Sequence, residues 1–412
     1  MTSRDALPLV SVVMSNFNGA AYLEAAVTSV LAQSYGALEV IVADDASTDD
    51  SVTILNRLAE DDPRLKTVAL TENKGPAGAR NAAIEAAQGD WLAIVDADDL
   101  VHPDRIARLM NHAKSHDADL IADDLVSFGA PETAGQTLLC DHVDDATIRV
   151  TPSAFFRSDT AGSGFASFGY LKPIIRRSVL GDMRYDETLR FGDDFDLYGR
   201  LLLSGACFMA VADPMYLYRR HAHSISHRLS VTALERLIAA HDNATTADTE
   251  LHQILAERRA GLVRALRYQR FVDAVKARKI WAACGHLLRH PELLKELRAS
   301  LAERRARGRS RAPSGAQPGD AQTVILGQGD ASGAVKAPPD AIWISDTHAE
   351  SITRLARLAT RGPLDIIAIG SAGLNTLGYA PIWRSAQLYL DAKTAQRTPV
   401  PQKARVEILP KA

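Results

Sequence analysis

The chain has 412 residues, enough for two or three domains, and its 47 basic and 50 acidic residues give a net charge of −3. No apolar run approaches the roughly 18–20 residues that span a bilayer, and no basic region followed by an apolar one begins the chain, so we expect neither a membrane span nor a secretory signal. Cys140, Cys207 and Cys284 lack the spacing of a metal or redox motif, which favours reduced thiols in a cytoplasmic protein.

The first 125 residues alternate between short apolar runs and helical patterns. The alternation predicts an α/β fold, in which a mostly parallel sheet is flanked by helices. Polar residues follow each of the first four strands, and ligands of such sheets bind outside the carboxyl ends of the strands. We therefore expect a binding site at that edge. The predicted strands are Leu9–Met14, Leu38–Ala43, Leu65–Leu70, Leu92–Val95 and Leu120–Ala122, and the helices between them include Ala20–Gln33 and Ala77–Gln88.

The next hundred residues are less regular in pattern. We expect a strand at Leu171–Arg176, a helix at Asp194–Leu203, and two short strands at Cys207–Val211 and Met215–Arg219. From about residue 228 to residue 306 the pattern is helical.

The helical stretch is basic, because residues 257–311 hold 16 Lys or Arg against five Asp or Glu. Such helices either bind an anionic membrane surface or pack on a protein core with their charges in water. Residues 308–340 are rich in Gly, Ala, Pro and Ser, which predicts a flexible linker. The tail after residue 341 has strand–helix–strand character. Six residues near the end of the helical stretch are predicted to form one apolar side of it: Trp281, Leu287, Leu288, Leu293, Leu294 and Leu297.

Three carboxylates, Asp96, Asp98 and Asp99, follow the fourth predicted strand within four positions. Mutual repulsion makes such a cluster costly unless a cation offsets it. Mg²⁺ prefers oxygen ligands and binds through carboxylates together with substrate phosphates. The alternative is a solvated turn that ends in a helix cap. The position at the carboxyl end of a strand favours the metal–diphosphate site.

Four motifs follow one another along the first quarter of the chain: Ser11–Gly19, Asp44–Asp49, Asn73–Asn81 and Asp96–Asp99. Together they resemble those of family 2 glycosyltransferases of the GT-A fold, which are inverting enzymes that use nucleotide sugars in bacterial surface-polysaccharide synthesis. The first predicted turn lacks the Gly-x-Gly-x-x-Gly pattern of Rossmann dehydrogenases.

The resemblance covers residues 9–225 and implies a Rossmann-like GT-A catalytic domain over residues 1–227. After it we expect a basic helical region (228–307), the linker (308–340) and a small α/β tail of unknown role (341–412).

The resemblance implies roles for residues on the nucleotide side of the site. Ser15 and Phe17 would contact the base, and Asp45 would accept a hydrogen bond from the uracil ring, with an Asx turn as its alternative. Asn73 belongs to the third motif. Arg80 would lie near the donor, where its planar fork suits phosphate, with an exposed helix arginine as the alternative.

The same resemblance implies a metal and diphosphate site. Asp96 would contact the ribose, and Asp98 would bind Mg²⁺ or Mn²⁺ against the diphosphate. His221 would complete the metal shell, with an ordinary surface histidine as the alternative. Arg219 and Ser224 would reach the diphosphate.

A second acidic group, within Phe191–Asp196, resembles the family's Glu-Asp pair at the start of a helix. Asp193 stands where the Glu is usual, and Asp194 aligns with the catalytic base. A helix amino terminus would favour its ionised form. The alternative is that both carboxylates only cap the helix.

Taken with the resemblance, these patterns predict a metal-dependent, inverting glycosyltransferase that uses a nucleotide sugar, expected to be a UDP-sugar. It would act on a glycan or lipid-linked acceptor in surface or exopolysaccharide synthesis, without a nucleic-acid partner. We expect it in the cytoplasm, with membrane contact through the basic helices of residues 257–311 as the alternative to free solution. The rival functions are a nucleotidyltransferase that forms nucleotide sugars and a nucleotide-sugar-binding protein without turnover.

Overall fold

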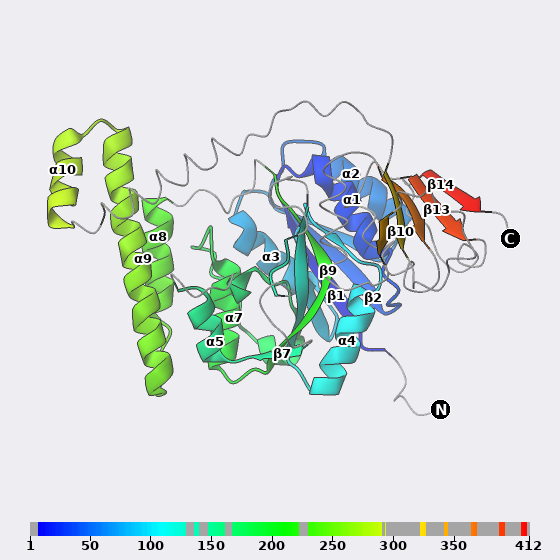
Figure 1. Ribbon diagram of the computed structural model, residues 1–412, viewed down its shortest axis with the longest axis horizontal. Helices are drawn as coiled ribbons and strands as arrows, with labels where there is room; N and C mark the ends of the chain where they lie inside the picture. Colours follow the sequence, from blue (N-terminus) through cyan, green and yellow to red (C-terminus); the bar gives the residue numbers. More distant parts are fainter. Residues whose placement is uncertain are drawn as a thin grey trace.

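A nine-stranded sheet flanked by helices forms the centre of the first 221 residues (Figure 1). The computed structural model describes residues 7–128, 136–139, 147–160, 167–221 and 230–290, Leu293, and five short strands beyond residue 321. The strands of the sheet are β1 (Val10–Asn16), β2 (Leu38–Asp44), β3 (Leu65–Ala69), β4 (Trp91–Ile94), β5 (Leu100–Val101), β6 (Leu120–Phe128), β7 (Thr147–Val150), β8 (Ile174–Arg176) and β9 (Phe208–Arg219). The predicted α/β architecture is confirmed.

The strand order brings several loops to one edge of the sheet. The strands lie in the order β3-β2-β1-β4-β8-β6-β9-β5, and β7 pairs with β9. The first four strands of this order are parallel, whereas β8 is antiparallel to both of its neighbours, β4 and β6. β1 therefore lies inside the sheet, with β2 and β3 on one side and β4 on the other. The loops after β1, β2 and β4 leave the sheet at a common edge.

The helices and the apolar strands account for the core. β2 and β4 are buried along their whole length, as expected for strands that are covered on both faces. The helices are α1 (Ala20–Leu31), α2 (Ser51–Asp61), α3 (Gly75–Ala86), α4 (Arg105–His116), α5 (Pro152–Ser158), α6 (Arg177–Leu180), α7 (Asp193–Leu203), α8 (Val231–Asp242), α9 (Thr249–Lys276) and α10 (Ile280–Arg289), with a 3₁₀ turn, η1, at Phe168–Tyr170.

One long strand replaces two predicted short ones. β9 runs through both predicted segments and pairs in parallel with the full length of β6. The register shifts on either side of Asp124, opposite the stretch of β9 that contains Pro214. Proline has no N–H to donate to the ladder, so the pairing is interrupted there without ending the strand. The segment Ala212-Asp213-Pro214 therefore marks an irregularity within one strand, not a break between two strands.

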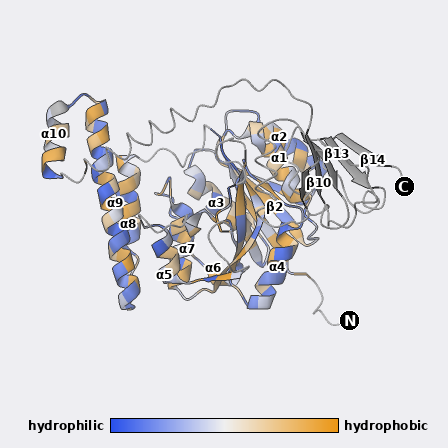
Figure 2. Cartoon of the chain, in the orientation of Figure 1, coloured by the Kyte–Doolittle hydropathy of each residue, from blue (hydrophilic) through white to orange (hydrophobic). Residues whose placement is uncertain are grey.

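The helical region belongs partly to the main core. Leu251, Ile254 and Leu255 of α9 are buried in the same apolar cluster as the sheet. The far end of α9 forms a separate small cluster with α10, and Figure 2 shows that apolar and polar residues alternate along both helices. Among the described residues, no helix combines the length and hydrophobicity needed to cross a bilayer.

The apolar side predicted for the end of this region is wrong. Leu287 packs against α9 and Leu293 is buried beside it. Trp281 and Leu288 are exposed on another side of α10. The side chains of Leu294 and Leu297 lie outside the described residues.

The described strands beyond residue 321 form a second, wholly parallel sheet. A strand, β10, lies inside the segment for which the sequence predicts a flexible linker, and it pairs with both β11 and β12. The strand order β11-β10-β12-β13-β14 is a common order of doubly wound α/β sheets. The strands are β10 (Gln322–Leu326), β11 (Ile342–Ile344), β12 (Leu364–Ala368), β13 (Gln387–Asp391) and β14 (Arg405–Leu409).

Candidate active site

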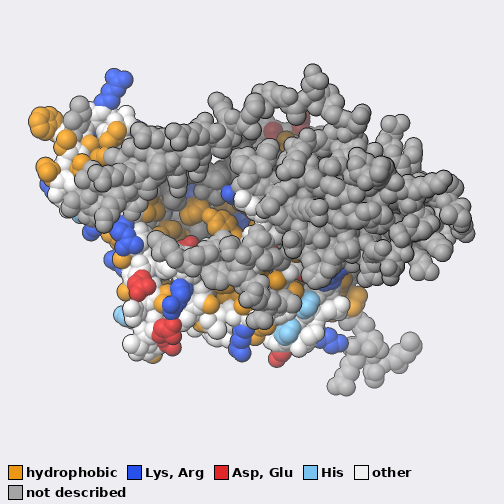
Figure 3. Space-filling view, in the orientation of Figure 1, with side chains coloured by type: hydrophobic (Ala, Val, Ile, Leu, Met, Phe, Trp, Pro, Cys, Tyr) orange, Lys and Arg blue, Asp and Glu red, His pale blue; other side chains and the backbone are white. Residues whose placement is uncertain are grey.

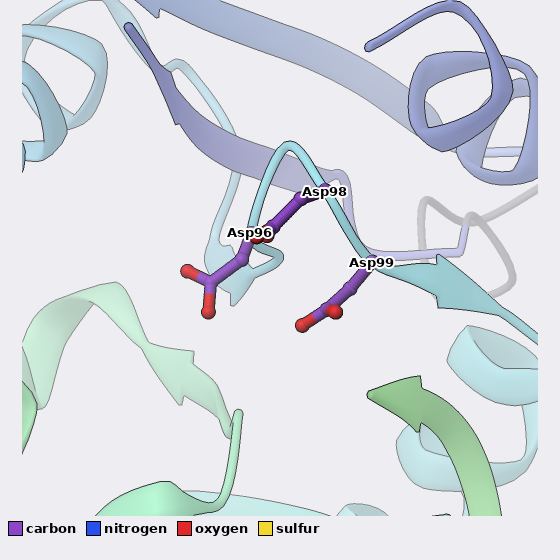
Figure 4. A group of neighbouring side chains, drawn as sticks. All are labelled: Asp96, Asp98 and Asp99. Carbon is purple, nitrogen blue, oxygen red and sulfur yellow. The ribbon is translucent and has the colours of Figure 1, made fainter. Parts of the chain in front are cut away.

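The loop between β4 and β5 carries the three clustered carboxylates (Figure 4). β4 is buried and pairs in parallel with β1, so the loop emerges at the edge where the loop after β1 also lies. One oxygen from each of Asp96, Asp98 and Asp99 lies within 4.8 Å of the others. The carboxylates therefore share one site, as expected from the sequence, instead of pointing apart into solvent.

Asp99 anchors this loop to β9. Its Oδ1 accepts a hydrogen bond from the backbone N–H of Arg219 at 2.6 Å, and its Oδ2 accepts one from the Tyr216 hydroxyl at 2.8 Å. Burial, and then the nearby charges of Asp98 and Asp96, raise the pKa of Asp99 well above its ordinary value. Asp99 is thus the buried support of the loop and does not cap a helix.

Asp98 is the most accessible of the three carboxylates, with a side chain that is 37% exposed. Its Oδ2 lies 2.9 Å from Nε2 of His221, and the ring of His221 packs against that of Tyr22 at 4.9 Å between centroids. The guanidinium of Arg219 donates to the backbone carbonyl of Asp98 at 2.6 Å. The end of β9 thus brings both predicted residues, His221 and Arg219, to the acidic loop. Ser224 lies outside the described residues.

Asp96 is held between two cations. Its Oδ1 accepts a hydrogen bond from Arg80 at 2.7 Å, and its Oδ2 lies 2.9 Å from the ammonium of Lys172. Burial works to raise the pKa of Asp96, but the charges and hydrogen bonds of Lys172 and Arg80 outweigh it and lower the pKa well below its ordinary value. Asp96 is therefore an anion whose partners come from α3 and from the segment before β8.

Asp193 and Asp194 begin α7, after Gly192, which adopts a left-handed conformation with φ of 75°. Arg80 donates to Asp193 at 2.7 Å, and its Nη1 lies 3.8 Å from Asp194. Burial and the neighbouring Asp194 raise the pKa of Asp193, although Arg80 opposes them. The side chains of this pair also bind cations on other elements: Arg80 on α3 binds Asp193, and Lys172 binds Asp194.

Lys172 joins the two acidic groups. Its ammonium lies 2.7 Å from Asp194 and 2.9 Å from Asp96. Burial favours a neutral amine, but the carboxylates of Asp194 and Asp96 raise the pKa of Lys172 well above its ordinary value. Arg80, Asp96, Lys172 and Asp194 thus close an ionic ring, with Asp193 attached through Arg80. We call these five residues the ionic ring.

Sequence reasoning missed Lys172 altogether. One feature of the sequence could have pointed to this residue: Lys172 is the only charged residue in the run Tyr170–Ile175. For Arg80, the sequence offered a phosphate contact or an exposed position, and the second is wrong because the side chain is buried.

A second buried ion pair contacts residues of the ionic ring and of the loop beside it. Arg105 binds Asp123 through Nε and Nη2, at 2.8 to 3.0 Å, and both side chains are completely buried. The same Arg105 donates to the backbone carbonyl of Lys172 and stacks on the ring of Tyr216, with 5.0 Å between the guanidinium carbon and the centroid. Arg105 therefore supports both Lys172 and the residue that holds Asp99.

The loops after β2 and β3 meet beside this site. Asp45 is buried, and its carboxylate accepts hydrogen bonds from the backbone N–H groups of Lys74 and Gly75 at 2.6 and 2.8 Å. Burial outweighs these bonds and raises the pKa of Asp45. Asn73 donates to the carbonyl of Asp45 at 3.2 Å and accepts from Arg190 at 3.2 Å. The partners of Asp45 lie on another loop, which is not the pattern of an Asx turn.

The loop after β1 contributes the remaining predicted residues. Ser15 is part of β1, and Phe17 follows the strand with 52% of its side chain exposed. An exposed aromatic ring at the carboxyl edge of the sheet is available for stacking on a planar ligand.

The first turn of α7 is also supported from the helical region. The ring of Phe195 stacks on Phe155 with centroids 4.4 Å apart. On another side, the guanidinium of Arg258, on α9, lies 4.1 Å from the centroid of Phe195 and pairs with Asp159 at 2.8 Å. The residue next to Asp194 is therefore fixed by contacts with α5 and α9.

Comparison with known proteins connects this geometry to a family. A model of "Glycosyl transferase family 2" matches residues 11–152. The succinoglycan biosynthesis protein ExoO of Rhizobium meliloti (strain 1021) is 32% identical over 309 residues, which are 73% of this chain and 87% of ExoO. The chain belongs to glycosyl transferase family 2. The succinoglycan biosynthesis protein ExoU of the same strain is also 32% identical to this family 2 chain, over 78% of it and 93% of ExoU.

A solved structure agrees with the fold of this family 2 protein. The crystal structure of S. aureus TarS 1-349 in complex with UDP-GlcNAc aligns with a TM-score of 0.53 and 21% sequence identity. The alignment covers 68% of this chain and 79% of that chain. The GT-A type of sheet, with its following helical region, is thereby confirmed.

Proposed function

We propose that this family 2 protein transfers a sugar from a nucleotide-sugar donor, expected to be a UDP-sugar, to a hydroxyl of a glycan or lipid-linked acceptor. The observation that carries the proposal is the bridge formed by Lys172 between Asp96 and Asp194, with distances of 2.9 and 2.7 Å. It places the carboxylate of the donor loop and the carboxylate of α7 on opposite sides of one ammonium. Transfer needs both groups close to one sugar.

We infer that the donor lies across the ends of β1, β2 and β4. Phe17 and Asp45 would contact the base, and Asp96 would contact the ribose. The buried guanidiniums of Arg80 and Arg219 bring positive charge to the side of a diphosphate. The complete proposed donor set is Ser15, Phe17, Asp45, Asn73, Arg80, Asp96, Arg219 and Ser224.

Mg²⁺ or Mn²⁺ is the proposed cofactor, and the residues fit such an ion. Asp98 is half-exposed, and its Oδ1 has no partner within the described part of the chain. Five carboxylates and three Arg or Lys side chains meet around the site, so a divalent ion would offset the excess of negative charge when all are ionised. Asp98 and His221 would hold the ion. A bound divalent ion stabilises the charge that develops on a departing diphosphate.

We propose Asp194 as the general base of an inverting reaction. Its carboxylate would accept the proton of the acceptor hydroxyl while that oxygen attacks the anomeric carbon from the face opposite the diphosphate. Lys172 at 2.7 Å and the Tyr198 hydroxyl at 3.3 Å fix the orientation of the carboxylate before the acceptor arrives. Asp193 is fixed by Arg80 instead, which favours Asp194 for this role.

The relatives suggest the pathway. ExoO and ExoU carry the printed description of succinoglycan biosynthesis proteins, which supports a role of this chain in exopolysaccharide synthesis. Nucleotide sugars are cytoplasmic metabolites in this proposal, so we place the catalytic domain in the cytoplasm, either in solution or at the inner face of the membrane.

A panel of nucleotide sugars tests the proposal. We expect Mn²⁺-dependent protection of the protein against thermal unfolding by one donor, because a ligand that binds only the folded state raises its stability. With that donor and an acceptor, UDP should be released and the product should have the inverted anomeric configuration, as measured by nuclear magnetic resonance. Release of pyrophosphate would indicate a nucleotidyltransferase, and protection without any turnover would indicate a binding protein; either result would refute the proposal.

A further inference from the structure

The end of the helical region has apolar side chains on two different sides of α10. One side packs on the end of α9, where Ala283 and Leu287 join Phe271. Trp281 and Leu288 lie on another side and are 91% and 84% exposed. These two residues are seven positions apart, which is about two helical turns, so their side chains share one face. A helix that is apolar on more than one side is normally buried or bound to a membrane, and α10 is not buried.

Several basic residues of α9 before this end are paired with acidic side chains. Along α9, Arg259 pairs with Asp242 at 2.7 Å and Arg270 pairs with Glu235 at 2.6 Å. Those positive charges are neutralised within the molecule. A charge that is already paired contributes little to binding at another surface.

From residue 274 to residue 290 the sequence contains no Asp or Glu. Within the part of the chain that the structure describes, the Lys and Arg side chains of this stretch form no ion pair. The end of α9 and α10 therefore combine exposed apolar side chains with basic side chains that no described acidic residue neutralises. These basic residues are Lys276, Arg278, Lys279 and Arg289.

We propose that residues 275–289, which we call the helix tip, dock on an anionic membrane surface. The aromatic ring of Trp281 is of the kind that lies at the level of lipid headgroups. Leu288, and Val275, which is 52% exposed, would enter the acyl boundary, while the basic side chains meet the anionic headgroups. The helix tip contains no Asp or Glu, which such a surface would repel.

The position of the helix tip is suited to a broad, flat partner. α10 lies at one extremity of the molecule, far from the central sheet (Figure 1). In Figure 3 the same end, at the upper left, presents orange and blue side chains together. A bilayer could therefore contact the helix tip without meeting the catalytic domain first. The proposal concerns attachment alone and does not depend on the transfer reaction.

Co-sedimentation of the full-length protein with lipid vesicles tests the docking. We expect binding to vesicles that contain phosphatidylglycerol in phosphatidylcholine, weaker binding to phosphatidylcholine alone, and loss of binding at high salt, since salt screens exposed charges. The exchange of Lys276→Glu and Lys279→Glu should weaken binding by at least about 25-fold, because each basic residue near an anionic surface contributes about fivefold.

Two matched controls separate docking from general effects. Lys114→Glu with Arg149→Glu makes the same change in net charge at exposed positions of the catalytic domain, and it should leave vesicle binding nearly unchanged. Trp281→Ala with Leu288→Ala should abolish binding at moderate salt, whereas Leu7→Ala with Val52→Ala, two exposed apolar positions elsewhere, should not. Thermal melts should coincide for all four variants, because every substituted side chain is at the surface.

Two results would overturn the proposal. One is equal binding of the helix-tip variants and their controls. The other is absence of vesicle binding together with a concentration-dependent dimer in sedimentation velocity that Trp281→Ala with Leu288→Ala dissociates, since the apolar face would then meet a second copy of this chain. Failure of sugar transfer with a water-soluble acceptor would contradict the proposed function and leave vesicle binding unaffected, so the two outcomes are distinguishable.

Discussion

The two acidic groups of the active site are neutralised in different ways. Asp98, in the loop between β4 and β5, is half-exposed and has His221 as its side-chain partner. Asp194, at the start of α7, is buried, and the ammonium of Lys172 lies 2.7 Å from it. The negative charge of Asp98 is only partly offset by the protein itself. The negative charge of Asp194 is neutralised by cations of the same chain.

Under the proposed function, this difference would separate two tasks that both need carboxylates. A metal ligand must be open to an ion that arrives from solution with its substrate. A general base must be held in one orientation before the acceptor arrives. The same side chain, aspartate, therefore acquires different properties from its neighbours, and substitutions on the two sides should have different effects.

The largest effect is expected at Asp194. Asp194→Asn should lower kcat by about 10²–10⁴-fold, the usual contribution of a positioned acid or base, while donor affinity changes little. Steady-state kinetics with the identified donor, and separate UDP titrations, measure the two quantities. Asp196→Asn is the matched control, because Asp196 lies on the same helix but pairs with Arg200. Unchanged kcat in Asp194→Asn would remove this residue from the base role.

Loss of the bridging cation should mainly reduce stability. Lys172→Met keeps most of the volume but leaves Asp96 and Asp194 without their shared partner, and breaking a buried pair in this way costs about 3–5 kcal/mol. Urea unfolding of the variant measures the change in the free energy of unfolding. In Lys172→Met with Asp194→Asn the loss should be smaller than the sum of the single losses. Additive losses would contradict a coupled ionic ring.

On the open side, the expected effect is on metal and nucleotide binding. Asp98→Asn should change the free energy of unfolding by no more than about 0.5 kcal/mol, as is usual at exposed positions. It should nevertheless remove Mn²⁺-dependent UDP binding, a loss of at least about tenfold. Isothermal titration with UDP, with and without Mn²⁺, measures this effect, and chelation by EDTA should make the wild type resemble the variant. A variant that binds UDP with unchanged metal dependence would exclude Asp98 as a ligand.

The smallest expected effect is a change in the pH dependence of stability at Asp193. Its pKa in the folded protein is raised above the ordinary value of 3.8, so the folded state holds a proton that the unfolded state has released. The stability that Asp193 contributes is therefore greatest at low pH and decreases as the pH rises above 3.8 through the raised value. In thermal melts from acidic to neutral pH, the stability of Asp193→Asn relative to the wild type should therefore increase as the pH rises above 3.8. Parallel profiles would contradict this prediction.

The positions of the residues proposed to bind the donor could largely be predicted from the sequence, because they depend on where each parallel strand ends. Asp96 and Asp98 follow an apolar strand, and the carboxyl ends of parallel strands share one edge whatever the details of packing. The position of Asp45 at the end of β2 follows from the same rule. Its hydrogen bonds to the loop before α3 do not, because they join two loops whose pairing depends on the folded backbone.

The ionic ring could not be predicted, because it depends on contacts that are distant in sequence. Arg80 and Asp193 are separated by 113 positions, and no local pattern marks their pairing. Lys172 reaches the site because β8 inserts between β4 and β6 in the opposite direction. The sequence predicts a strand at Leu171–Arg176, but neither its direction nor the strands with which it pairs. The segment Ala212-Asp213-Pro214 likewise indicates a break between two strands, whereas pairing with β6 keeps β9 continuous.

The stacking of Arg258 on Phe195 sets a limit on how this chain can be divided. A boundary drawn after residue 227 would look natural in a truncation or in a chimaera that exchanges acceptor-side segments among relatives. It would nevertheless remove Arg258, whose guanidinium lies 4.1 Å from the ring of Phe195, the residue next to Asp194. A segment exchanged among relatives should therefore extend at least through residue 258, so that the first turn of α7 keeps its contact with α9.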